Sequence, residues 1–194
     1  MAAPKELRPW RLVSSDVVFS ARPWLTVHRE TVELASGTVL DDFYRVVLPD
    51  FAAVVALTGD ERLVMVRGYK HGIGRVVLSV PAGLVDEGEA PLQAAQRELR
   101  EETGYTAPEW RGLGSFVVDG NRQCGTMHVF LALSAQQTQA PRADEAEELE
   151  VDLVLPSTVI QAIRAGEVPH LATATALGLA VMAGALPSAS TPSR

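Results

Sequence analysis

Three glutamates, Glu98, Glu101 and Glu102, are spaced three and four residues apart. On a helix, residues at these separations lie on one face, so the three carboxylates would be neighbours. Like charges at such spacing destabilise a plain helix by about 0.2–0.5 kcal/mol per pair. A cluster of hard oxygen ligands is, however, what Mg²⁺ prefers. The pattern therefore has two interpretations, a divalent cation site or a solvated acidic face.

The residues around these glutamates predict a helix over 91–103. Leu92, Ala95 and Leu99 recur at helical spacing and would form an apolar face beside the acidic one. Pro91 suits the first turn of a helix, and Gly104 suits the position just after its end. The helix would therefore pack on a sheet while it presents its carboxylates to a ligand.

The wider spacing favours the cation site. Gly83 is followed after five residues by Glu89, and after seven more by the run Arg97-Glu-Leu-Arg-Glu-Glu-Thr-Gly-Tyr105. This pattern resembles the signature of the Nudix hydrolases, which is Gly, five residues, Glu, seven residues, then Arg-Glu-apolar-x-Glu-Glu-x-Gly-apolar. Tyr69-Lys70 and the run Val80-Pro-Ala-Gly83 resemble the ADP-ribose pyrophosphatase branch. The resemblance implies an enzyme that cleaves the diphosphate of ADP-ribose, or of a related nucleoside-diphosphate sugar, into AMP (or another nucleoside monophosphate) and a sugar phosphate.

The resemblance also implies roles for single residues. It assigns Mg²⁺, with Mn²⁺ as an alternative, to Glu98, Glu101, Glu102 and the backbone carbonyl of Ala82. Arg97 would orient the glutamates, and Glu101 would be shared between ligation and catalysis. Glu89, near the helix start, would organise the preceding loop.

In the branch that the sequence resembles, the general base often lies on an acidic loop before a late strand, and the matching segment here is the acidic run 144–151. Glu145 is the first choice, with Glu147 and Glu148 behind it, and the alternative is a solvated charge run. Arg67 and Lys70 are candidates for gripping the substrate phosphates, and the alternative is that both are ordinary surface charges.

Two departures from the branch leave the substrate open. Ser79 stands where close relatives usually carry Glu, and the stretch 118–125 has no proline where relatives that cleave ADP-ribose tend to have one. The alternatives are a Nudix pyrophosphatase for another dinucleotide or a GDP-sugar, and a non-catalytic nucleotide sensor. The intact glutamates favour an enzyme.

Composition excludes other classes of function. The 194-residue chain has a net charge of -7 without a basic stripe, so we expect no nucleic-acid partner. Cys124 is its single cysteine, which agrees with a reducing cytoplasm. The first ten residues lack the apolar core of a signal peptide, and polar residues interrupt 171–186, so we expect no membrane partner.

The chain as a whole predicts a mixed α/β (α+β) fold. Strands are expected at 24–34, 38–48, 51–57, 62–66, 76–80, 114–118, 126–133 and 149–155, helices at 157–165 and 169–183, and a polar loop at 136–148. The resemblance implies the Nudix fold, a mixed sheet sandwiched between helices, after an N-terminal antiparallel β subdomain. We expect three parts: 1–48, which in the resembled branch helps to build a homodimer; 49–184, the hydrolase domain; and 185–194, a disordered tail.

Overall fold

The computed structural model describes residues 7–142 and 148–187, and the chain divides into two compact units. The first unit contains the residues up to Pro49 together with Val117–Thr126, and the second contains Asp50–Phe116 and the chain from Met127 onward. Glu145 and most of the expected tail lie outside the described residues.

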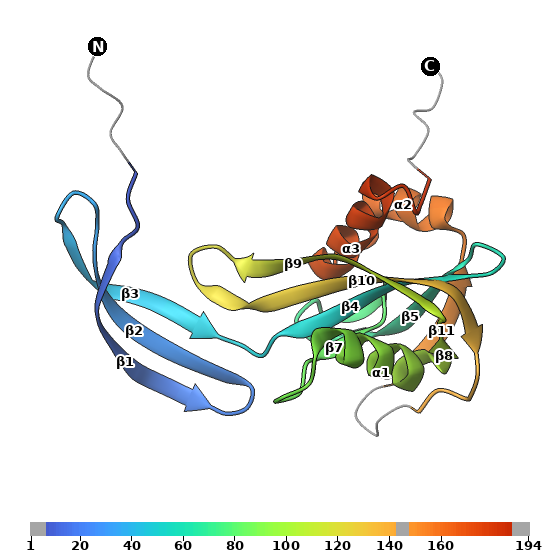
Figure 1. The fold of residues 1–194 in the computed structure, drawn as a ribbon, viewed down its shortest axis with the longest axis horizontal. Coiled ribbons are helices and arrows are strands. Elements are labelled where there is room, and N and C mark those ends of the chain that lie inside the picture. The colour runs from blue at the N-terminus through green and yellow to red at the C-terminus, as the bar shows by residue number, and fades with distance from the viewer. Residues whose placement is uncertain (1–6, 143–147, 188–194) are drawn as a thin grey trace, which may run out of the picture. The chain divides into compact units, whose positions relative to one another are not determined.

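The first unit is an antiparallel arrangement of β1 (Arg11–Ala21), β2 (Leu25–Glu33) and β3 (Val39–Val47) (Figure 1). The turn between β9 (Glu109–Asp119) and β10 (Gln123–Gln137) belongs to this unit, where Gln123 pairs with Val46 of β3. The Asp119 carboxylate closes the turn by accepting hydrogen bonds from the backbone N–H groups of Asn121 and Arg122. These bonds, first that from Arg122, lower the pKa of Asp119.

The second unit is built on a mixed sheet. Its further strands are β4 (Phe51–Thr58), β5 (Leu63–Lys70), β6 (Arg75–Ser79), β7 (Ala82–Leu84), β8 (Tyr105–Thr106) and β11 (Leu149–Val154). β4 lies between β10, to which it is parallel, and β5, to which it is antiparallel. β6 and β11 both pair with β5, and the short β7 pairs with β4.

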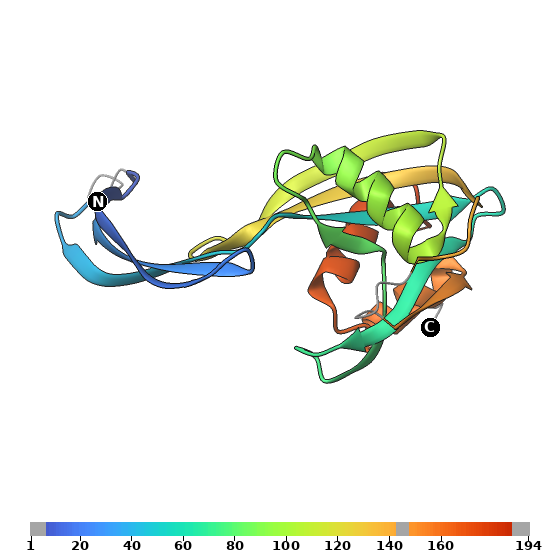
Figure 2. The same cartoon turned by 90° about the horizontal axis from the view of Figure 1, so that it is seen from below.

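Helices cover both faces of this sheet. α1 (Pro91–Thr103) lies on one face, and α2 (Pro156–Arg164) and α3 (Leu171–Met182) lie on the other (Figures 1 and 2). Because successive side chains of a strand point to opposite faces, β4 contributes to two hydrophobic clusters. Val54 packs with Leu99 of α1, whereas Val55 packs with Leu177 of α3. The predicted fold class is confirmed, and so is the expectation that 51–57 is buried on both faces.

Several strands differ in length from those predicted. β5 continues to Lys70, four residues beyond the predicted end, because β6 folds back and pairs with it. β10 extends in both directions and reaches Gln137, two residues into the predicted loop, because its end pairs with β8. Both extensions depend on backbone partners distant in sequence, which side-chain periodicity does not reveal. Among the described residues, no helix is long and apolar enough to cross a membrane.

Candidate active site

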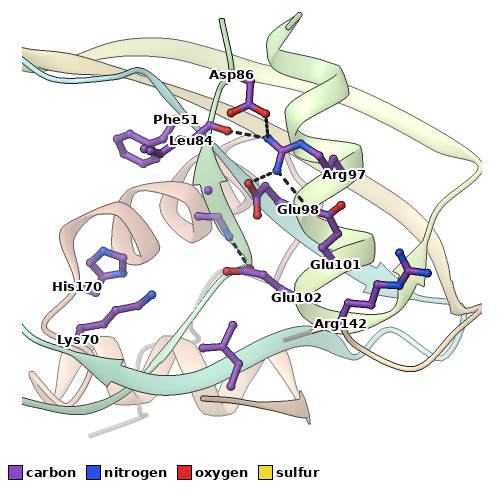
Figure 3. A pocket seen from close by; sticks show the side chains of 13 residues that line it. Phe51, Lys70, Leu84, Asp86, Arg97, Glu98, Glu101, Glu102, Arg142 and His170 are labelled. Carbon is purple, nitrogen blue, oxygen red and sulfur yellow. Dashed lines mark hydrogen bonds and ion pairs between the residues drawn. The ribbon is translucent and has the colours of Figure 1, made fainter. Parts of the chain in front are cut away.

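The helix α1 positions the three glutamates as the spacing predicted. It begins at Pro91 and ends before Gly104, whose left-handed backbone (φ 75°) lets its N–H bond to the carbonyl of Arg100. Leu99 is fully buried against the sheet. The opposite side of the helix faces a pocket of about 500 Å³. Glu98, Glu101 and Glu102 all line that pocket, so one wall of it is acidic (Figure 3).

The glutamates differ in exposure. Glu102 is only 6% exposed, and its Oε2 accepts a hydrogen bond of 3.0 Å from the backbone N–H of Ala82. The side chain of Glu98 is 14% exposed and that of Glu101 is 41% exposed. Glu102 therefore joins α1 to β7, and Glu101 is the most accessible carboxylate of the three.

The strand β7 passes directly against the acidic wall. A Cβ atom at Gly83 would overlap the Glu98 carboxylate where it now lies, so glycine here leaves room for this orientation of the Glu98 side chain. The strand is held there by its pairing with β4, in which Gly83 lies opposite Ala52. The carbonyl of Pro81 also accepts a hydrogen bond from the N–H of Val54. The backbone at Ala82, which lines the same pocket, is thereby fixed beside the carboxylates.

Arg97 connects the helix to the loop before it. Its guanidinium donates to both carboxylate oxygens of Glu89, at 3.0 and 2.8 Å, and to the carbonyl of Leu84 at 2.9 Å. It also donates to Glu98 at 2.5 Å and lies 3.5 Å from Glu101. The bond to Glu89 is the largest of the effects that raise the pKa of Arg97, and the same bond lowers the pKa of Glu89. Arg97 therefore stays charged and restrains two of the three glutamates.

Glu89 has a second contact, within the loop. Its Oε2 accepts a hydrogen bond of 3.1 Å from the backbone N–H of Asp86. The Glu89 carboxylate thus binds both Arg97 and the backbone of the loop between β7 and α1.

The other walls of the pocket carry cations and apolar groups. Lys70, at the end of β5, and His170, just before α3, lie near each other and face the side of the pocket that holds Glu102 (Figure 3). Phe51 and Leu149 supply apolar surface. Arg142 is a further lining residue, and its backbone N–H donates to the carbonyl of Glu101 at 2.8 Å.

The structure does not bring Arg67 to this pocket. Its guanidinium bonds to Asp152 of β11, at 2.6 and 3.0 Å, and it lines a separate pocket of about 280 Å³. Arg67 and Lys70 are three residues apart on one strand, so they point to opposite faces. Of the two predicted phosphate-binding cations, only Lys70 therefore lines this pocket.

Sequence reasoning missed Arg142 and His170. Arg142 lies two residues before the acidic run, and His170 directly precedes a helix, but neither position carries a pattern that points to a ligand. Both reach the pocket through contacts with distant segments: Arg142 through Glu101, and His170 by its place at the start of α3. Glu145 lies outside the described residues.

The acidic wall has the chemistry of a site for a hard divalent cation. Three carboxylates and the backbone at Ala82 line one pocket, and oxygen donors of this kind suit Mg²⁺ or Mn²⁺. Within residues 7–142 and 148–187, no three His, Cys, Asp or Glu side chains already converge as metal ligands. Arg97 engages the Glu98 carboxylate. To share one cation, Glu98 and Glu101 would have to rotate about their side-chain bonds.

The family model described as the NUDIX domain matches residues 48–172. The matched region includes the loop, helix and pocket described above. The chain belongs to the Nudix hydrolase family. Divalent metal ions are the general cofactors of Nudix hydrolases. A second model, described as the nucleoside diphosphate sugar hydrolase N-terminal domain, matches residues 10–50.

Individual relatives place the chain within the Nudix family. It is 30% identical to the ADP-ribose pyrophosphatase of Bacillus subtilis (strain 168) over 168 residues, which cover 86% of this chain and 90% of the relative. It is 29% identical to the methanol dehydrogenase activator of Bacillus methanolicus, covering 74% of this chain and 76% of that one. A crystal structure titled as an ADP compounds hydrolase superposes with a TM-score of 0.79 at 22% identity, covering 94% of this chain and all of that one. The structural match confirms the Nudix fold, and the chain is an ADP-ribose pyrophosphatase-like Nudix hydrolase.

Proposed function

We propose that this Nudix hydrolase cleaves the diphosphate linkage of ADP-ribose or a related nucleoside-diphosphate sugar, giving AMP (or another nucleoside monophosphate) and a sugar phosphate. The observation that carries the proposal is one pocket with an acidic wall of three glutamates and a separate wall with Lys70. Such a pocket suits a diphosphate, whose negative charge needs cations on several sides. The relative from Bacillus subtilis and the match of the N-terminal domain model support the substrate class.

Glu98, Glu101, Glu102 and the carbonyl of Ala82 are the groups proposed to hold Mg²⁺, or Mn²⁺ in its place. When bound, the cation supplies positive charge against the phosphate oxygens and makes nearby water more acidic. Arg97 and Gly83 act on the glutamates: the guanidinium restrains Glu98 and Glu101, and the missing Cβ leaves room for the Glu98 carboxylate. These residues position the ligand groups before the substrate arrives.

The ammonium of Lys70 and the guanidinium of Arg142 are the protein cations that we propose to face the phosphates. Both residues line the pocket. Arg142 offers a planar fork that matches two phosphate oxygens, whereas Lys70 acts as a point charge.

In the reaction, the oxygen of water attacks one phosphorus, the bridging P–O bond breaks, and a carboxylate takes the proton from the attacking water. We propose Glu145 as this base, with Glu147 and Glu148 behind it. The chain enters the segment that contains Glu145 at Arg142 and leaves it at Leu149, and both of these residues line the pocket.

The protein is also proposed to act as a homodimer through its first unit. The outermost strand β1 is exposed on both faces, and Leu12, Val17, Val18 and Phe19 are each more than half exposed. A strand edge with such an apolar surface is a liability unless another surface covers it. A second copy of the chain is the partner expected from the branch that the sequence resembles. The cytoplasmic location stays a prediction.

A substrate panel tests the proposal. Purified protein is incubated with Mg²⁺, then with Mn²⁺, and separately with ADP-ribose, GDP-mannose and a dinucleoside polyphosphate, and products are identified by mass spectrometry. We expect AMP and ribose 5-phosphate from ADP-ribose, and no product after a chelator is added. If the protein cleaves another member of the panel faster than ADP-ribose, it is still a Nudix hydrolase but its substrate is that other compound. No cleavage of any member with either metal would overturn the proposal and favour a nucleotide sensor.

A further inference from the structure

His170 lines the pocket at the start of α3, and its ring does not cap the backbone of that helix. It is the N-cap residue of α3, a position whose side chain often accepts a hydrogen bond from the first turn, yet its ring makes no such bond. Its Nδ1 lies 3.0 Å from the hydroxyl oxygen of Thr173, one turn into the helix. The ring lines the pocket (Figure 3), and its contact with Thr173 restrains its orientation.

The contact with Thr173 decides which ring nitrogen carries the proton. Thr173 is fully buried, and its hydroxyl oxygen accepts a hydrogen bond of 3.3 Å from the backbone N–H of Val80. A buried hydroxyl must also donate its hydrogen. Across the described part of the chain, the one acceptor recorded for that hydrogen is Nδ1 of His170. This points to a hydroxyl that donates to Nδ1, and the neutral ring expected from that arrangement carries its proton on Nε2.

His170 and its neighbour Lys70 differ in charge. Burial, and second the positive charge of Lys70, lower the pKa of His170 below its ordinary value of 6.5, so the ring is neutral near pH 7. Lys70 carries the positive charge of this wall and suits a phosphate oxygen. The neutral ring offers one N–H donor, and because its Nδ1 lone pair is already engaged, it is not suited to hold a metal ion.

From this geometry we propose that His170 is a specificity-determining residue for the sugar half of the substrate, with its Nε2–H donating to a sugar hydroxyl while Lys70 binds the adjoining phosphate. The inference rests on the proposed function, because it takes the pocket to hold a nucleoside-diphosphate sugar. Phe51 and Leu149 line the same pocket and give it apolar surface. Thr173 is then a positioning residue that acts through the ring of His170.

Kinetics with a matched pair of substrates test the role of His170. The pair is ADP-ribose and the methyl ester of ADP, which keeps both phosphates and lacks the sugar hydroxyls. For His170→Ala with Mg²⁺, we expect KM for ADP-ribose to rise about tenfold, the loss of one net hydrogen bond, with little change in kcat. KM for the methyl ester should be unchanged. His170→Gln, which keeps an N–H donor at similar reach, should recover part of the loss.

The control is His71→Ala, because His71 is exposed on the β5–β6 turn and does not line the pocket. Equal losses for both substrates in His170→Ala would show that the ring binds phosphate or only supports the wall, and would overturn the proposal. No effect on either substrate, while the wild type cleaves ADP-ribose, would overturn it as well.

A measurement without turnover separates this inference from the proposed function. In ¹⁵N-labelled protein, the His170 ring should show a protonated Nε2 and an unprotonated Nδ1 at pH 7.5. Ribose 5-phosphate should shift the Nε2 resonance, and inorganic phosphate should not. Thr173→Ser should keep this pattern, whereas Thr173→Val should lose the fixed tautomer.

If ribose 5-phosphate shifts Nε2 but the wild type cleaves no nucleotide, the sugar phosphate site stands and the proposed reaction fails. A proton on Nδ1 in the wild type, or equal shifts with inorganic phosphate, would overturn the assignment of His170.

Discussion

At the scale of single residues, Glu102 is the most enclosed of the three glutamates of the acidic wall. It accepts a hydrogen bond from the N–H of Ala82 and lines the pocket beside Glu98 and Glu101. A buried carboxylate is stabilised by a positive partner, so this position suits a cation. Among the three glutamates, Glu102 is therefore the one whose substitution tests the cation site most directly.

Glu102→Gln should reduce turnover while preserving the fold. The amide oxygen can still accept from Ala82, but the charge that holds a cation is lost. Even loss of a group that only supports a metal ligand costs about 10–100-fold in metal affinity or activity, so we expect at least the upper part of that range. Turnover of ADP-ribose against Mg²⁺ concentration provides the measurement. Glu87→Gln, the same change at an exposed loop position outside the pocket, should have no effect. Equal activity in both variants would exclude Glu102 as a ligand.

His170 should make the protein less stable in mild acid. Burial, and then Lys70, lower the pKa of its ring in the folded state. Below pH 6.5 the unfolded chain therefore binds a proton at this position that the folded chain binds only at lower pH, so the free energy of unfolding falls as the pH drops. Above pH 6.5 both states are neutral there and the full stability remains.

Urea denaturation at pH 7.5 and at pH 5.5 measures this effect. His170→Gln should lose less stability between the two pH values than the wild type, because glutamine does not titrate. His71→Gln should behave as the wild type does. If the wild type and His170→Gln lost the same amount, the low pKa of His170 would be refuted.

At the scale of elements, the end of α1 supports the segment that leads to the acidic run. The carbonyl of Gly104 accepts hydrogen bonds from the N–H groups of Thr138 and Gln139, and the carbonyl of Glu101 accepts from Arg142. A Cβ atom at Gly104 would overlap the carbonyl oxygen of Gln139. The helix end thus holds Arg142 at the pocket and sets where the chain departs toward Glu145.

Gly104→Ala should lower the free energy of unfolding by more than the cost of placing alanine in a left-handed backbone conformation. Gly88 provides the matched comparison, because its φ of 81° is similar to the 75° of Gly104 and a Cβ there would meet open space. We expect Gly88→Ala to cost about 1–2 kcal/mol and Gly104→Ala to cost more, because residues 138–142 must also move.

Chemical denaturation measures both glycine variants, and ADP-ribose turnover should fall only in Gly104→Ala, since that change displaces Arg142. Equal stability losses, with turnover intact in both variants, would show that the contact between α1 and this segment has no part in the site.

At the scale of the whole molecule, the first unit presents the surface proposed for dimer formation. Val17→Asp places a charge on the exposed apolar strand β1, and we expect it to shift the protein toward a monomer and to lower turnover. Ala35→Asp adds the same charge to the same unit, in the turn between β2 and β3, and should leave the dimer intact. Light scattering after size exclusion gives the mass. A monomeric wild type at micromolar concentration would contradict the dimer proposal.

The sequence by itself determined the acidic helix, the glycine beside it, and the family. The glutamates, the apolar positions of α1 and the end signals at Pro91 and Gly104 are local patterns, governed by helical geometry over neighbouring residues. The same holds for β4, whose continuous apolar run predicted a strand buried on both faces. Local patterns of this kind are read directly from a single segment.

Only the tertiary structure decided which residues complete the pocket. Arg67 and Lys70 looked equivalent in sequence, but the alternation of β5 points Arg67 toward Asp152 and Lys70 into the pocket. Arg142 and His170 reach the pocket through backbone pairing and helix packing with segments far away in the chain. Such contacts depend on how strands and helices are ordered in space, and no short-range periodicity encodes that order.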